Sequence, residues 1–168
     1  MRLISAQRGS GLAYGALATA LVILLVGALY DVYATYQYRT WGYQAAGEAA
    51  RIGTLQGTGL DYASGTVSLD PTAAQGAAEA FLVDALAQKG VTGYSYDVRV
   101  ITAPTGGTIP GFPPVPQANL DGGDMRLAGP GVGVYLEFAV PTAWLGLLDR
   151  HAYHVHVFSA AQAVEVQP

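Results

Sequence analysis

Three histidines near the C-terminal end are the residues whose types and spacing could do chemistry. They form the pattern His151-x-x-His154-x-His156 in a segment that alternates as a β-strand does. On a strand His154 and His156 share one face, where two imidazoles can hold copper or zinc. The chain has no cysteine, and the nearest acid, Asp149, stands at the strand entrance. We interpret the histidines as a polar strand face, keep His154 and His156 as alternative metal ligands, and expect no cofactor.

The other segments that could carry chemistry lack the surroundings it needs. Asp121-Gly122-Gly123-Asp124 offers carboxylates to calcium, but the fuller pattern of a calcium loop is missing, so we interpret it as a turn. Gly129-Pro130-Gly131-Val132-Gly133 is followed by neither the Lys-Ser/Thr pair nor the helix of a phosphate loop. No serine stands in a nucleophile-elbow context. We therefore expect a protein that is not an enzyme.

Composition sets the broad class. A chain of 168 residues predicts one domain with at most an appendage, and its 12% of charged residues is low for a soluble globular protein. The chain has 8 basic and 12 acidic residues. That balance lacks the basic footprint of a nucleic-acid-binding protein, so we expect no nucleic-acid partner.

An uncharged run of twenty residues extends from Gly11 to Tyr30. As a helix it spans about 30 Å, the thickness of the hydrocarbon core of a bilayer. A buried core helix would be shorter and less uniformly apolar. A cleaved signal peptide would have a shorter apolar region, followed by small residues rather than tyrosines. We predict a transmembrane helix over 11–30, surrounded by membrane lipid.

The charges flanking this run predict its orientation. Arg2 and Arg8 precede it and Asp31 follows it directly, while six basic and all twelve acidic residues lie beyond the run. By the positive-inside rule, residues 1–10 form a short cytoplasmic N-terminus. The C-terminal domain is then periplasmic or extracellular, in a single-pass protein of the cytoplasmic membrane.

Small residues recur on one face of the predicted span. Gly11, Gly15, Ala18 and Val22 are three or four residues apart, a spacing that lets a second helix approach closely. We predict that this face is a helix-packing interface with other transmembrane proteins, as part of a multiprotein complex.

Aromatic residues crowd the exit from the span. The predicted membrane-exit belt comprises Tyr30, Tyr33, Tyr36, Tyr38 and Trp41. The series extends farther than a belt needs, so its outer members must pack on the protein's own domain or on a partner. Ala45, Ala49 and Ile52 continue one narrow helical face. We predict one helix from about Ser10 to Ile52, ending at Gly53, whose residues 31–53 form a stalk.

The remaining residues, 54–168, have the pattern of a small exported α+β domain. Asp70 and Pro71 predict the start of a helix over Thr72–Lys89, and Gly90 its end. Apolar patterns predict strands at Thr66–Leu69, Tyr94–Ile101, Val132–Val140 and Ala152–Phe158, the last with a possible extension over Ala160–Val166. We expect antiparallel strands packed on one or two helices.

A Pro- and Gly-rich segment separates two of these strands. Residues 103–130 include Phe112-Pro113-Pro114-Val115-Pro116. We interpret the segment as a solvated loop, with an extended docking surface as the alternative.

Two motifs resemble a known family. Arg8-Gly9 precedes the span, and Ala49-Ala50-Arg51-Ile52-Gly53 follows the aromatic exit. The layout resembles TadE-like proteins of tight-adherence pilus systems, which are similar to pseudopilins. The resemblance implies a pilin-like domain and a role in a pilus or secretion apparatus. The family usually has a glutamate, used in processing and assembly, about five residues beyond the first glycine, whereas this chain has Tyr14 there.

Three functions follow as hypotheses. The first is a non-enzymatic, pseudopilin-like component that acts by helix packing and protein–protein contacts. The alternative is an accessory single-span subunit of another membrane complex, for example a bioenergetic one (respiratory or photosynthetic), that reuses the TadE-like form. A third is a membrane-anchored metal-handling protein built on the histidines.

Overall fold

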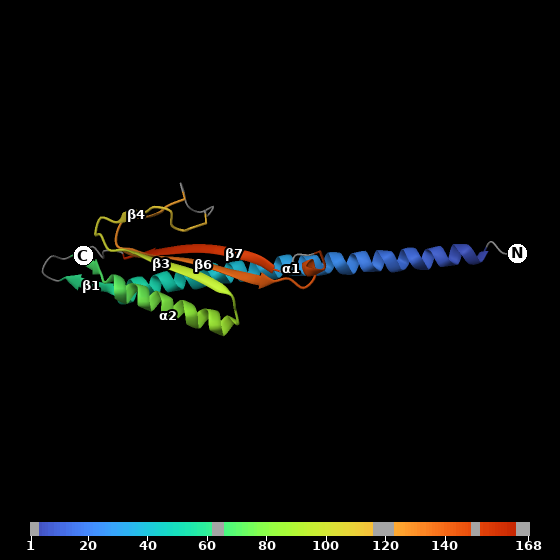
Figure 1. The fold of residues 1–168 in the computed structure, drawn as a ribbon, viewed down its shortest axis with the longest axis horizontal. Coiled ribbons are helices and arrows are strands. Elements are labelled where there is room, and N and C mark those ends of the chain that lie inside the picture. The colour runs from blue at the N-terminus through green and yellow to red at the C-terminus, as the bar shows by residue number, and fades with distance from the viewer. Residues whose placement is uncertain (1–3, 62–65, 116–122, 149–151, 164–168) are drawn as a thin grey trace, which may run out of the picture. The chain divides into compact units, whose positions relative to one another are not determined.

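The chain is an α+β protein with a long apolar N-terminal helix and a small antiparallel sheet (Figure 1), as the sequence predicts. The structure, a computed structural model, describes residues 4–61, 66–115, 123–148 and 152–163. Its elements are α1 (Ile4–Gly57), β1 (Thr58–Asp61), β2 (Thr66–Leu69), α2 (Pro71–Lys89), β3 (Tyr94–Ile101), β4 (Gly107–Ile109), β5 (Met125–Leu127), β6 (Gly131–Pro141), η1 (Leu145–Leu148) and β7 (Ala152–Gln162).

These elements form two compact units, which we describe separately. The anchor unit comprises Met1–Gln37 and Val140–Tyr153. The sheet unit comprises Tyr38–Ala139 and His154–Pro168. Helix α1 contributes its first part to the anchor unit and its last part to the sheet unit.

Helix α1 is longer than predicted, with 54 residues. The prediction that it ends at Gly53 is wrong, because this glycine serves packing rather than termination. A Cβ at Gly53 would lie 2.7 Å from the carbonyl oxygen of Ala74 in α2. The helix continues to Gly57, whose carbonyl oxygen accepts a hydrogen bond from the Asp70 N–H at 2.9 Å.

Helix α2 has the predicted caps. The Asp70 side chain accepts hydrogen bonds from the N–H groups of Thr72 and Ala73, at 2.9 and 3.2 Å. Gly90 adopts the left-handed conformation, with φ of 70°, and its N–H donates to Ala87. Local residue types therefore determine both ends of α2.

The central sheet has the strand order β3-β6-β7. Strand β3 runs antiparallel to β6, with Tyr94 opposite Phe138 and Ile101 opposite Gly131. The predicted strands of this sheet are confirmed, with β6 and β7 a few residues longer than expected. Strand β2 is also confirmed and pairs with β1, which the sequence did not predict. The expected extension of β7 toward Val166 reaches residues 164–168, outside the described part of the chain.

One core of the sheet unit lies between the sheet, α2 and the last part of α1. Gly42 of α1 lies against the Phe138 ring, and Gly53 contacts both Ala78 of α2 and Val132 of β6. Thr54, also buried, donates to the carbonyl oxygens of Ala50 and Ala161. Small buried residues supply the α1 face: Ala45, Ala46, Ala49 and Ala50.

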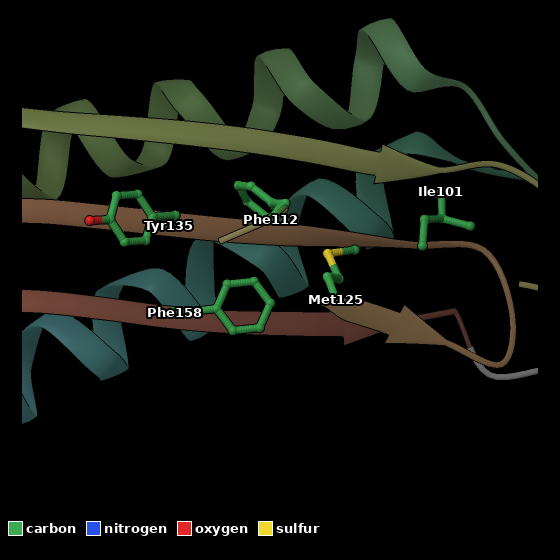
Figure 2. Close-up of a cluster of buried hydrophobic side chains, with 5 residues drawn as sticks. All are labelled: Ile101, Phe112, Met125, Tyr135 and Phe158. Carbon is green, nitrogen blue, oxygen red and sulfur yellow. The ribbon is translucent and has the colours of Figure 1, made fainter. Parts of the chain in front are cut away.

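A second core covers the other face of the sheet and comes from the Pro- and Gly-rich segment. Phe112 and Met125 are 3% and 1% exposed, and they pack with Ile101, Tyr135 and Phe158 (Figure 2). The Phe112 and Phe158 rings meet edge to face at 5.6 Å. The interpretation of this segment as a solvated loop is therefore wrong, because apolar side chains tie it to the sheet. Strands β4 and β5, which it contains, were not predicted.

Two helical glycines give a paired stability prediction. Gly53→Ala should lower the free energy of unfolding by about 1–3 kcal/mol, because the methyl group would overlap the α2 backbone. Gly76→Ala should raise it by about 0.5–1 kcal/mol, because Gly76 is an exposed α2 residue with open space around it. Urea unfolding in detergent micelles, followed by circular dichroism, measures both. Shifts of the same sign would contradict the packing role of Gly53.

Candidate functional site: the apolar helix and its exit

The first part of α1 exposes its apolar side chains. Within the described residues, α1 is the one helix long and apolar enough to cross a membrane, and 11% of its most apolar window is buried. Its large exposed side chains include Leu17, Leu21, Val22, Ile23, Leu24, Leu25, Val26 and Leu29. The described parts of the chain therefore do not cover this surface.

The predicted helix-packing residues all lie on this exposed part of α1. Gly11, Gly15, Ala18 and Val22 are exposed, and apart from the neighbouring residues and backbone of α1 itself no described atom lies within 4 Å of a Cβ placed at Gly11 or Gly15. Thr19 donates its hydroxyl hydrogen to the Gly15 carbonyl at 2.9 Å. The face is thus accessible to a second helix, and the contact itself remains a prediction.

The aromatic residues of the exit divide into two groups. Tyr30, Tyr33 and Tyr36 are 61–64% exposed. The Tyr38 and Trp41 rings instead lie 6.5 and 5.9 Å from the Phe138 ring, and the Lys89 ammonium lies over both. Tyr38 and Trp41, the outer members of the series, thus pack on the protein's own domain, which is one of the two alternatives that the sequence left open.

Tyr38 and Trp41 belong to the sheet unit, where they contact Phe138. The membrane-exit belt of Tyr30, Tyr33, Tyr36, Tyr38 and Trp41 stays a prediction, and this packing gives its last two members a structural role as well.

Asp31, directly after the apolar run, is buried and fully engaged. Only 3% of its surface is exposed. Its carboxylate accepts hydrogen bonds from the backbone N–H groups of Ala143, Trp144 and Leu145, at 3.3, 2.7 and 2.7 Å. Sequence reasoning used Asp31 only as a flanking charge. The overlooked signal was its position, because a carboxylate next to an apolar span is costly unless it has partners.

The segment that Asp31 holds contains the short helix η1. The first N–H groups of a helix have no partner within it, and a nearby side chain usually supplies one. Asp31 has this role although it is distant in sequence. The Trp144 ring lies against Gly27, where a Cβ would overlap it. The residues from Pro141 to Leu148 are thereby fastened to α1 at Gly27 and Asp31.

Asp31→Asn should loosen this attachment. The amide keeps one acceptor oxygen but loses the charge that strengthens all three hydrogen bonds. We expect hydrogen exchange at the amides of Ala143, Trp144 and Leu145 to accelerate about tenfold or more. Asp97→Asn is the matched control, because Asp97 pairs with Arg99 on the exposed surface of β3. Unchanged protection in Asp31→Asn would contradict the attachment.

The histidines lie in a small polar cluster on the sheet. His154 and His156 share a face, as predicted, and their Nδ1 atoms lie 3.6 and 3.7 Å from the two carboxylate oxygens of Glu137 in β6. The sheet thus brings Glu137 to these histidines, and His151 lies outside the described residues. Among the residues that the structure describes, no three His, Cys, Asp or Glu side chains are arranged to hold a metal ion.

Tyr135 completes this cluster. Its hydroxyl lies 2.9 Å from His156 Nδ1 and donates to Glu137 at 3.4 Å. Burial, reinforced by the Glu137 charge, raises the pKa of Tyr135 to about 12. The phenol therefore keeps its neutral, hydrogen-bonding form up to a higher pH than an ordinary tyrosine does.

The aspartate pair considered for calcium is only partly described. Asp121 lies outside the described residues. Asp124 accepts a hydrogen bond from the Gly111 N–H at 2.9 Å. This bond joins the two sides of the Pro- and Gly-rich segment, which gives Asp124 a structural role.

Tyr135 should make stability fall at high pH. Because its pKa is higher in the folded protein than the ordinary value of 10.0, its contribution is complete below pH 10 and is lost as pH rises toward about 12. Tyr135→Phe should remove this part of the pH dependence. Unfolding free energies across that range test the expectation, with the exposed Tyr153→Phe as control. Equal slopes for the two variants would contradict it.

Comparison with models of known protein families, with curated proteins and with solved structures gives no match for this chain. The candidate site is therefore defined by its own geometry. It is an exposed apolar helix, and Asp31 in the same helix holds the segment from Ala143 to Leu145 by hydrogen bonds. The last part of the helix is a core element of the sheet unit.

Proposed function

We propose that the chain is a single-pass protein of the cytoplasmic membrane. Residues 11–30 of α1 cross the bilayer, with residues 1–10 in the cytoplasm and the sheet unit in the periplasm or outside the cell. The observation that carries the proposal is the uncovered apolar surface of α1. Only 11% of the most apolar window of this helix is buried. An apolar surface this large favours a lipid or protein environment over water.

Within that membrane we propose a non-enzymatic, pseudopilin-like role in a tight-adherence pilus or secretion apparatus. The division of α1 supports it, since one end is free to pack with other helices and the other end carries the sheet unit. The motif Ala49-Ala50-Arg51-Ile52-Gly53 agrees with this division. Ala49 and Ala50 are fully buried and Gly53 admits α2, while Arg51 faces solvent and pairs with Glu48 at 2.9 Å.

One observation favours a second candidate function. Tyr14 occupies the position where TadE-like proteins usually have a glutamate, and its side chain is 73% exposed. A pilus subunit that relies on an acid there would lack it. The second candidate is therefore an accessory subunit of another membrane complex, for example a bioenergetic one.

Cross-linking in native membranes tests both candidates. The chain has no cysteine, so each variant carries a single thiol. Ala18→Cys places it on the small-residue face, and Ala20→Cys places it about 200° around the helix. Both alanines are exposed. When each thiol carries a maleimide-linked photoreactive group, which after irradiation inserts into a C–H bond of its neighbour, Ala18→Cys should give an adduct with a second membrane protein, and Ala20→Cys should give far less.

The identity of the adduct decides between the candidates. Pilin, platform protein or assembly ATPase, retained after mild detergent extraction, would support the pseudopilin-like role. A stable multisubunit complex with bound cofactors would support the accessory role instead. Equal adducts from both variants would contradict the predicted interface, and a protein absent from the membrane fraction would contradict the span.

A further inference from the structure

The segment from Pro141 to Leu148 is an uncharged, apolar part of the anchor unit. Leu147 is 67% exposed and Trp144 is 37% exposed. A highly exposed leucine close to a partly exposed tryptophan, on a segment attached to an exposed apolar helix, forms a continuous apolar surface of the kind that another apolar phase covers. The described residues of this chain do not cover Leu147.

Its attachment fixes where this segment lies along the helix. Trp144 contacts Gly27, and the backbone from Ala143 to Leu145 bonds to Asp31. Gly27 and Asp31 bracket the end of the uncharged run at Tyr30. The segment is therefore held at the level where α1 would leave the bilayer.

We propose that residues 142–148 form a second membrane contact, which lies in the interfacial layer of the same bilayer that α1 crosses. This inference rests on the proposed membrane insertion of α1. Trp144 would lie at the headgroup level, where its ring can be in apolar surroundings and its indole N–H in water. Leu147 would reach the boundary of the acyl chains.

The hydrogen bonding of the segment suits a lipid neighbour. A turn that enters a water-poor layer must satisfy its own backbone N–H groups, because lipid offers no partners. Asp31 satisfies three of them in η1 and the residues before it. In the same contact the carboxylate itself gains three donors, which makes its place beside the apolar span tolerable.

The exposed side chains of residues 142–148 continue the exposed apolar surface of α1, which points to lipid as the neighbour of this segment. Val26, Leu29 and Tyr30 are 58%, 61% and 63% exposed on the part of α1 to which the segment is attached. The proposed membrane surface thus extends from the helix onto the segment. Two contacts hold a helix at a fixed depth and rotation better than one, since a single span can slide and tilt.

Tryptophan quenching tests the inference directly. The chain has 2 tryptophans and 11 tyrosines, so Trp41→Phe leaves Trp144 as the only tryptophan, which is excited at a wavelength that tyrosine does not absorb. The full-length variant is reconstituted in phosphatidylcholine vesicles whose acyl chains are brominated near the headgroup. Trp144 should lose most of its emission. In the matched variant Trp144→Phe, the remaining Trp41 packs on Phe138 and should lose little.

A pair of exposed leucines provides a second measurement. An environment-sensitive fluorophore is attached to the thiol of Leu147→Cys and, in a separate protein, to that of Leu55→Cys. The two leucines are 67% and 64% exposed. In vesicles the label at position 147 should shift to the blue and be protected from aqueous iodide. The label at position 55, beyond the aromatic exit, should show neither change.

The outcomes separate this inference from the proposed function. If the protein fails to float with vesicles, the membrane span fails and the inference falls with it. If the protein floats while Trp144 and the label at position 147 are quenched by iodide and not by brominated lipid, the span stands and the inference is overturned. Cross-linking of Leu147→Cys to another protein in native membranes, with no lipid quenching, would also overturn it.

Discussion

Close packing against the last part of α1 is the constraint on which the sheet unit depends. A row of alanines and glycines lets α2 and β6 approach the helix backbone, and at Gly53 the room for a methyl group is already taken by the Ala74 carbonyl. Larger residues would push α2 and the sheet away. The helix therefore acts as a core element of the sheet unit, although its first part belongs to the anchor unit.

In the anchor unit, the Asp31 carboxylate and the backbone N–H groups at the start of η1 supply one another with hydrogen-bond partners. A charge directly after an apolar run and a short helix with unpaired N–H groups are each unfavourable in water-poor surroundings. Together they satisfy one another through three hydrogen bonds. This contact joins residues far apart in sequence and turns a flanking charge into a tertiary attachment.

On the face of the sheet that points away from α1, the Pro- and Gly-rich segment and the histidines each acquire a structural role. Gly133 leaves space for Met125, so the Pro- and Gly-rich segment can fold onto the sheet with Phe112. Next to this cluster, Tyr135 and Glu137 of β6 meet the histidines of β7. The pairing of β6 with β7 places Tyr135 and Glu137 beside the described histidines, and the packing of Phe112 and Met125 brings the Pro- and Gly-rich segment to the same face.

The sequence alone determined the features that local residue types govern. These are the long apolar helix, the caps of α2 at Asp70 and Gly90, and the positions of the main strands, because capping and strand alternation depend on neighbouring residues. Only the tertiary structure decided the rest. It made Gly53 a packing residue rather than a helix end, packed Trp41 against Phe138, buried Phe112, and gave Asp31 its hydrogen-bond partners. Each of these depends on what a distant segment places nearby, and local sequence patterns do not contain that information.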